Sequence, residues 1–438
     1  MLSRPSKKQA VMAVLLPPIL VIGLYGKAAA LTIQEAYRQA LQNYETVQIA
    51  QESLTQSELE KRKALSGFLP TIKSELSYTR RPDAIQSPSG GVIRPRSDER
   101  FQLTLNQPLY SGGRATSVYK MAGLGIEGSR AALGSTKEEL LFQVAGSFYD
   151  TLKAKKNVLL EETEVKRLEA HRRDAAIRFQ VGEVTKDILL RAEAELSAAK
   201  ARLIRAGNDL QVAKDQLALL TKLPDDFDLE EPPQPTVPVQ RDQEQLDTAF
   251  KFRQDLVKKR LDEQIAQEGV RFARGSFYPF LSLEGQFIQD EQSPKSPFFT
   301  VNQDKLAILK LTFPLFEGGL RIAELRESKS KARQAELDHT LLQKQIRLEV
   351  RRANLDIQTL NSVLENLRDQ LAFATENYTL VSKRFQVGLA TNIDVLDANN
   401  ILIDAERQLT NNTYDRDLAV IRLQKGMGVF LQYTGLEK

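Results

Sequence analysis

The most informative absences from this sequence concern cysteine, tryptophan and histidine. The 438 residues contain no cysteine, no tryptophan and only two histidines. Without cysteine, the chain has no disulfide framework, no thiolate metal site and no cysteine that carries a lipid. His171 and His339 each stand alone in sequence of helical character, which favours surface or interface residues over metal ligands. We therefore expect neither a metal site nor a cofactor.

Long hydrophobic runs are absent except near the start of the chain. Three basic residues among the first eight precede an apolar run from Ala10 to Tyr25, and Ala28-Ala29-Ala30 follows it. This order of basic, apolar and small residues is typical of a secretory signal peptide. A retained membrane anchor is the alternative, although the run is short and contains Pro17-Pro18. We predict that residues 1–30 are a signal peptide and that the protein is exported.

Neither charge nor motifs indicate nucleic-acid binding or catalysis. The sequence contains 61 basic and 57 acidic residues. Residues 1–30 contain four of the basic residues and none of the acidic ones, so the remaining chain has no net charge. The string Gly123-Leu-Gly125-Ile-Glu-Gly128 fits a dinucleotide site, but that motif needs a strand directly before it and a parallel strand after the helix. A long helical stretch follows here, so close helix contact explains the glycines better. We predict no enzyme.

One stretch of the chain occurs twice. Arg178-Phe-Gln-Val-Gly182 returns as Arg384-Phe-Gln-Val-Gly388, an offset of 206 residues. The same offset carries Pro108-Leu-Tyr110 and Gly112-Gly113 onto Pro314-Leu-Phe316 and Gly318-Gly319. Matched landmarks in constant register predict one structural unit that has been duplicated.

The repeat divides the chain into segments. After the signal peptide we expect a first repeat over 31–221, a proline-rich and acidic connector over 222–241, a second repeat over 242–425 and a tail over 426–438. Each repeat should contain a helix, a β-hairpin, a long helix and a further helix, the first helix spanning about 31–65. The connector, with five prolines between 224 and 238, should lie outside the helices and belong to no core.

Two segments of each half alternate between apolar and polar residues, as half-buried β-strands do. Four strands of about ten residues match transmembrane β-strands, although a soluble antiparallel sheet shows the same alternation. The exported character and the missing hydrophobic helices favour an outer membrane. The residues that we expect to face lipid are Ile72, Leu76, Leu103, Leu105, Leu283 and Leu311.

Four strands cannot close a barrel by themselves, and lipid does not tolerate an open sheet edge. Several chains must therefore contribute to one barrel. Two chains would give eight strands and a filled interior, whereas three would give twelve strands and room for a lumen.

Most of the remaining sequence is predicted to be helical. No proline interrupts residues 113–179, which corresponds to roughly 100 Å of helix. The chain turns back after Gly182 and Gly388 into shorter helices over about 186–220 and 393–424, so each pair should form a coiled-coil hairpin. The second long helix carries a seam with spacings of four and three residues, a pattern that requires partner helices: Ile346, Val350, Ala353, Ile357, Leu360, Leu364, Leu367, Leu371, Ala374, Tyr378, Val381 and Phe385. The first long helix keeps part of this apolar seam, from Leu140 to Phe179, but places Glu161 and Arg172 on it.

Taken together, these motifs resemble the TolC-like outer-membrane channel proteins of efflux and type I secretion systems. The resemblance covers essentially the whole mature chain. It rests on Leu31-Thr-Ile-Gln-Glu-Ala36, Leu41, Asn43, Phe68-Leu-Pro70, Pro108-Leu-Tyr-Ser-Gly-Gly113 and both tip motifs, of which Gly388-Leu-Ala-Thr-Asn-Ile-Asp394-Val-Leu-Asp397-Ala is the most similar.

The resemblance implies a mainly α fold with a membrane β-barrel portion. Long antiparallel coiled-coil hairpins would form a tunnel, and four strands per chain would enter a shared twelve-stranded barrel in a homotrimer. The protein would be an exit duct in the outer membrane of a Gram-negative-type bacterium and would extend into the periplasm. Its partners would be a periplasmic adaptor (membrane fusion) protein, an inner-membrane pump or ABC transporter, and outer-membrane lipid.

The resemblance also assigns residues at the two hairpin tips. Asp394 and Asp397 are three residues apart on one helical face, and in a trimer they would form rings of carboxylates in a cation-binding constriction. Helix capping by aspartate is the alternative explanation. Adaptor docking is expected at the exposed turns, which comprise Gly182, Glu183, Val184, Thr185, Gly388, Leu389, Ala390 and Thr391.

The chain departs from the family pattern where a known member holds its tip closed. An aromatic hydroxyl, a basic residue and an aspartate are replaced by Phe385, Ala390 and Ile188, with Asp187 one position early. The bonds of that closed state therefore do not transfer to this chain. Two other classes remain as alternatives: a periplasmic adaptor, which would need only one hairpin and compact β-domains, and a structural coiled-coil protein, which would not explain the strands.

Overall fold

The computed structural model describes residues 30–223, 227–238, 241–296 and 302–436. All but the last residue of the expected signal peptide lies outside these ranges. The first half contains α1 (Ile33–Asn43), α2 (Glu45–Ser66), β1 (Thr71–Arg80), β2 (Ile85–Gln86), β3 (Val92–Arg94), β4 (Ser97–Tyr110), α3 (Arg114–Gln180) and α4 (Lys186–Thr221). The second half contains α5 (Asp242–Phe252), α6 (Gln254–Gly275), β5 (Phe280–Ser293), β6 (Gln303–Thr312), α7 (Leu320–Gln386), α8 (Asn392–Gly426) and α9 (Phe430–Tyr433).

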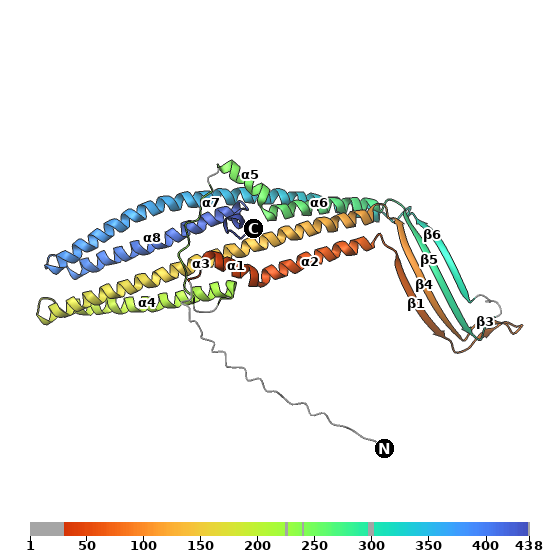
Figure 1. The fold of residues 1–438 in the computed structure, drawn as a ribbon, viewed down its shortest axis with the longest axis horizontal. Helices are drawn as coiled ribbons and strands as arrows, with labels where there is room; N and C mark the ends of the chain where they lie inside the picture. Colours follow the sequence, from red (N-terminus) through yellow and green to blue (C-terminus); the bar gives the residue numbers. More distant parts are fainter. Residues whose placement is uncertain (1–29, 224–226, 239–240, 297–301, 437–438) are drawn as a thin grey trace, which may run out of the picture.

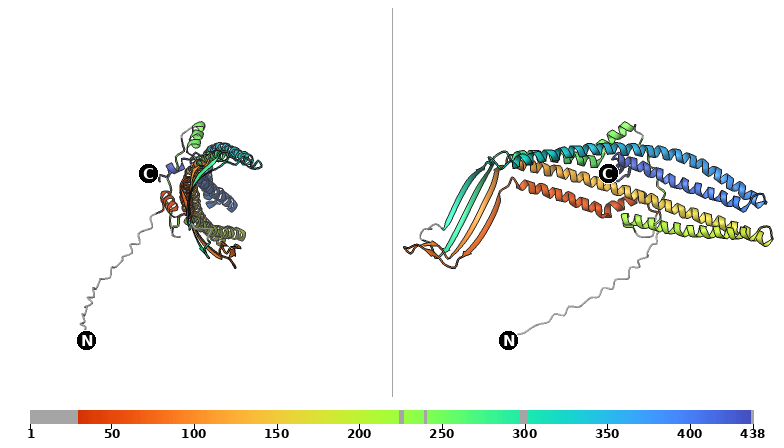
Figure 2. Two further views of the ribbon diagram at one scale, coloured as in Figure 1. Left: turned by 90° about the vertical axis from the view of Figure 1, so that its right-hand side faces the viewer. Right: turned by 180° about the vertical axis from the view of Figure 1, so that it is seen from behind.

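The molecule is long and narrow (Figure 1). The helices run side by side along one axis, the sheet extends from one end at an angle to them, and the two hairpin turns lie together at the other end. Seen from the end, helices and strands follow an open arc, with α5 and the C-terminus on its outside (Figure 2). Among the described residues, no helix combines the length and the apolar character that crossing a membrane requires.

The four main strands form one antiparallel sheet in the order β1-β4-β5-β6. Its register places the residues expected to face lipid on the same face: Ile72 lies opposite Leu105, and Leu283 lies opposite Leu309. Leu103 lies opposite Phe287 on that face as well. The predicted alternation is therefore confirmed. The short β2–β3 hairpin was not predicted, because it lies in a segment rich in proline and glycine that reads as a loop.

The two long helices confirm the prediction from the heptad spacing. Both α3 and α7 contain 67 residues. All eight buried residues of α7 belong to the predicted seam, from Ile346 to Phe385. Helix α7 packs against α8, and α3 packs in the same way against α4, so each half ends in the predicted coiled-coil hairpin.

Two expectations about the region near the middle of the molecule were wrong. The first helix is not continuous, because Tyr44 adopts an extended backbone with ψ of 129° and separates α1 from α2. The connector does enter a core: Phe227 and Leu229 are buried in the same cluster as Leu31. A parallel bridge explains this packing, since the Leu31 amide donates to Asp228 O and the Glu230 amide donates to Leu31 O. Burying these apolar side chains removes them from water, which outweighs the local preference for a surface loop.

The glycine string also differs from the expectation. Gly123, Gly125 and Gly128 lie inside α3, with no strand directly before them, so they cannot form a dinucleotide loop. The close helix contact that we expected is missing too. A Cβ atom built on Gly123 would meet only the flexible Lys61 side chain, at 4.0 Å, and one built on Gly125 or Gly128 would meet nothing within 4 Å.

Candidate functional site at the hairpin tips

Both hairpin tips have the same backbone geometry. Gly182 and Gly388 each adopt a φ of 79°, a left-handed conformation that glycine tolerates best. The amide of the next residue donates to the carbonyl five positions earlier: Glu183 to Arg178 and Leu389 to Arg384, each at 2.8 Å. This is the Schellman arrangement at a helix C-terminus. The repeated motif therefore encodes a helix stop followed by a reversal of the chain.

The side chains of the two tips are mostly exposed. Of the eight residues expected to bind an adaptor, only Val184 and Ala390 are partly buried. Both turns lie at the same end of the molecule (Figure 1). The structure thus brings all eight residues to one free end.

Asp394 and Asp397 are both exposed near the start of α8. Asp394 also belongs to a capping box, because its Oδ2 accepts from the Thr391 amide and hydroxyl, each at 2.7 Å, and its own amide donates to Thr391 Oγ1 at 3.2 Å. These bonds to Thr391 hold the pKa of Asp394 below its usual value. Asp394 therefore caps its helix while carrying a negative charge.

The two tips differ in charge. The positions in α4 that correspond to Asp394 and Asp397 hold Ile188 and Arg191. Acidic pairs therefore occur at one tip of the chain only. The first tip instead carries Glu183 in its turn and Asp187 in the first turn of α4.

The end of α3 contacts the tip of the second hairpin. Arg178 stacks its guanidinium over the Phe385 ring at 4.6 Å and donates to Gln386 O at 3.0 Å. His171 packs against Phe385 and hydrogen-bonds the Asn392 side chain, which makes it an interface residue as expected. Arg178 therefore joins the end of α3 to the tip of the second hairpin.

A buried polar seam between α3 and α8 continues from these contacts. Asn399 donates its side-chain amide to Glu164 at 2.6 Å, and Arg167 pairs with Glu406 at 3.0 Å. Glu161 accepts from Arg407 at 2.7 Å and from Arg202 at 3.3 Å. Several atoms in this seam lack a hydrogen-bond partner in the described structure, among them Glu164 Oε2, Arg167 Nη1 and Glu406 Oε2. The two hairpins therefore meet through polar groups that are only partly satisfied.

Sequence reasoning missed most of this seam. The one signal was Glu161, which occupies a heptad position that an apolar residue would normally hold. Its partner from α8, Arg407, is distant in the chain, and no local pattern connects the two.

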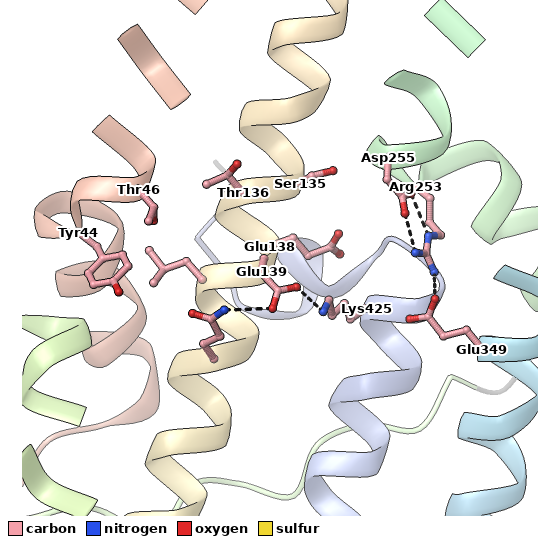
Figure 3. Close-up of a pocket in the computed structure, with 12 residues that line it drawn as sticks. Tyr44, Thr46, Ser135, Thr136, Glu138, Glu139, Arg253, Asp255, Glu349 and Lys425 are labelled. Atoms are coloured by element: carbon pink, nitrogen blue, oxygen red, sulfur yellow. Dashed lines mark hydrogen bonds and ion pairs between the residues drawn. The ribbon is translucent and has the colours of Figure 1, made fainter. Parts of the chain in front are cut away.

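A second polar cluster lies near the middle of the molecule (Figure 3). It lines a cavity of about 670 Å³ between α3, α6, α7 and the end of α8. Arg253 pairs there with Asp255 at 2.7 Å and Glu349 at 2.6 Å, and donates to Gly426 O at 3.2 Å, so it connects α6, α7 and α8. Glu138 is 8% exposed and its Oε1 has no hydrogen-bond partner among the described residues. Burial raises the pKa of Glu138 to about 7.

Comparison with known proteins relates this architecture to one family. The family model described as "Outer membrane efflux protein" matches residues 36–221 and 246–429. The outer membrane efflux protein BepC of Brucella suis is 23% identical over 329 residues, which cover 74% of this chain and 71% of BepC. The outer membrane protein TolC of Escherichia coli is 22% identical over 363 residues, 78% of this chain and 71% of TolC. The CmeC outer membrane channel of Campylobacter jejuni has a TM-score of 0.79 at 19% identity and covers 91% of this chain and 86% of CmeC.

Proposed function

Because the chain belongs to the outer membrane efflux protein family, a family of transport proteins of the outer membrane, we propose that it is the exit duct of a tripartite efflux pump or a type I secretion system. Substrates would pass from an inner-membrane transporter through this duct to the exterior. The observation that carries the proposal is the pairing of a one-face-apolar sheet at one end with two exposed tips at the other. A single chain thereby reaches from a lipid-facing sheet to a docking surface at its far end.

The duct is proposed to be a homotrimer. The sheet has two open edges, β1 and β6, and lipid does not accommodate unpaired edges. Three copies would supply twelve strands, which leave room for a lumen. The open arc of the helices (Figure 2) would continue that lumen as a tunnel.

Adaptor docking is proposed at the two turns and cation binding at the aspartates. The turns are the free end of the molecule, where a periplasmic partner can reach them. Three copies of Asp394 and Asp397 would bring six carboxylates around one axis, where bound cations would offset their repulsion. The capping bonds of Asp394 do not neutralise its charge, so capping and cation binding are compatible.

The test of this proposal combines location, assembly and conductance. We expect the protein in the outer-membrane fraction, as a trimer that separates into monomers on heating, with channel activity in planar bilayers. Location in the periplasmic fraction would favour an adaptor. Location in the outer membrane without conductance would favour a structural coiled-coil protein.

A further inference from the structure

The cavity near the middle of the molecule (Figure 3) contains more acidic groups than the basic groups there can pair with. Four acidic and two basic side chains line it. The two basic side chains, Arg253 and Lys425, already pair with three of the acidic ones. The fourth, Glu138, has no ion-pair partner among the residues that the structure describes, although it is only 8% exposed. A buried carboxyl group of the cavity is therefore left without a cation, which is costly when the group is ionised.

The hydrogen-bond donors that line the cavity are largely occupied. Thr136 donates its hydroxyl hydrogen to Ala132 O at 3.0 Å, and Gln143 donates its side-chain amide to Glu139 at 3.2 Å. Arg253 uses all three of its guanidinium nitrogens in bonds to protein oxygens. These donors therefore serve the protein itself and not the content of the cavity.

The groups that remain are acceptors. The Oε1 atom of Glu138 has no hydrogen-bond partner in the described part of the chain. The hydroxyl oxygen of Thr136 and the side-chain oxygen of Gln143 can each still accept a bond. A ligand that fits this lining must supply several donors and a positive charge. An ammonium group does so, because it has three donors and no acceptor.

The size of the cavity and the spacing of its acidic groups distinguish an organic cation from a metal ion. Within the described ranges, no group of three or more acidic, histidine or cysteine side chains is placed to hold a metal ion. The volume of about 670 Å³ lies within the roughly 300–1,000 Å³ of sites for small organic ligands. The cavity therefore favours an organic cation.

We propose that this cavity binds a small organic cation through a primary ammonium group, with Glu138 as the counter-ion. Thr136 and Gln143 accept further N–H bonds from the same ligand. This inference does not depend on the proposed exit-duct function, because the lining is complete within one chain and lies apart from both the sheet and the hairpin tips.

Binding of the cation should strengthen as pH rises. Burial raises the pKa of Glu138 to about 7, the charges of Arg253 and Lys425 oppose this rise, and Asp255 adds to it. The carboxylate that the cation needs is therefore a minor form at pH 6 and the major form at pH 8, which corresponds to a rise in affinity of about tenfold. The other titratable groups that line the cavity are Tyr44, Glu139 and Glu349.

Calorimetric titration of the purified protein tests the site. The probes are putrescine, which carries primary ammonium groups, choline, which carries a positive charge but no N–H donor, and MgCl2. Phosphate buffer avoids a competing amine. We expect putrescine to bind at pH 8 about tenfold more tightly than choline, because only putrescine can donate to the free acceptors. Its affinity should fall about tenfold at pH 6.

Variants of the lining assign the binding to these residues. Glu138→Gln keeps the shape of the side chain but removes its charge, so putrescine should bind about tenfold more weakly and without the pH dependence. Glu127→Gln, at an exposed site on the same helix, is the matched control and should bind like the natural protein. Thr136→Val removes one acceptor and should weaken binding several-fold, whereas Thr136→Ser should preserve it.

Four results would each overturn the proposal. They are absence of putrescine binding, equal affinity for choline, tighter binding of Mg²⁺ than of putrescine, and equal putrescine affinity in the natural protein and the Glu138→Gln variant. Circular dichroism shows whether each variant is folded. If Glu138→Gln does not fold, the two Thr136 variants decide, and equal putrescine affinity in both would reject the site.

Discussion

The side-chain amide of Asn399 donates to Glu164 at 2.6 Å and joins the two coiled-coil hairpins at a carboxylate that is 1% exposed. Burial raises the pKa of Glu164, and the hydrogen bond from Asn399 together with the charges of Arg167 and Arg202 partly opposes this effect. The contact between the hairpins therefore depends on the buried Glu164 carboxylate, which has few hydrogen-bond donors other than Asn399 within reach.

Removing the amide should destabilise the hairpin contact. Asn399→Leu removes a hydrogen bond from the buried carboxylate of Glu164, and we expect the free energy of unfolding to fall by about 1–3 kcal/mol. Combining it with Glu164→Leu should recover part of this loss, because the uncompensated group is gone. The thermal unfolding midpoint of the purified protein measures both variants, and Asn400→Leu, at an exposed neighbour, is the control. Additive losses in the double variant would contradict the coupling.

Stability should decrease as pH rises through the range set by Glu138. Its pKa in the folded protein is about 7, against 4.5 for an ordinary glutamate, so the folded state holds this proton more tightly than the unfolded state. Below pH 4.5 the group has no effect. Between pH 4.5 and pH 7 Glu138 loses its proton in the unfolded state but keeps it in the folded state, so the free energy of unfolding falls by up to roughly 3 kcal/mol.

Glu138→Gln should remove this component of the pH dependence. We expect the variant to unfold at a higher temperature than the natural protein at pH 8 and at a similar temperature at pH 4. Glu127→Gln, at an exposed site on the same helix, should change neither value. An unchanged difference between pH 4 and pH 8 in the Glu138 variant would show that another group is responsible.

Sequence reasoning recovered the features that local patterns encode. The heptad spacing of α7 identified its buried seam, and the glycines of the repeated motif identified both turns, because each requirement acts within a few residues of the chain. The strand faces followed from alternation for the same reason.

The features that were missed depend on distant partners. The extended backbone at Tyr44 has no glycine or proline to signal it. Burial of Phe227 and Leu229 depends on Leu31, which lies at the opposite end of the first repeat. The bonds of Glu161 and Glu164 come from α8, so the chain near them gives no indication of their role.

The apolar face of the sheet should tolerate no charge. Leu103→Arg or Leu283→Arg should cost roughly 2–4 kcal/mol in lipid and reduce the amount of assembled trimer. Gln102→Arg, on the opposite face of β4, is the control and should assemble normally. Quantification of heat-labile trimer in outer-membrane fractions provides the measurement. Normal yields of both leucine variants would refute the assignment of this face.

The hairpin tips should be reached by an adaptor. Cysteine at Glu183 or Leu389, each carrying a thiol-reactive crosslinker, should capture the coiled-coil hairpin of a periplasmic adaptor in cells. Glu230→Cys, at the exposed part of the connector, is the comparison site. If crosslinks formed only at Glu230, docking would have to be assigned to the middle of the molecule.

Neutralising the acidic pair should weaken cation selectivity. Asp394→Asn with Asp397→Asn removes the charge while the amide at 394 can still accept capping bonds, whereas alanine at both positions also removes the cap. Planar-bilayer currents of either double variant should show less block by divalent or trivalent ions on the periplasmic side. Asp187→Asn, near the start of α4, should leave the block unchanged. Equal block in the natural protein and both variants would show that these aspartates act only as caps.

The duplication has a consequence for how the protein can change by mutation. In a ring built from identical single hairpins, every substitution at a tip would recur at each position around the axis. In the proposed trimer two hairpins share one chain, so a substitution at one tip would recur only at every second position around the axis. Asp394 and Asp397 have no acidic counterparts in α4, because the corresponding residues there are Ile188 and Arg191. A mutation can therefore change the charge of one tip while the other tip keeps its sequence and its turn.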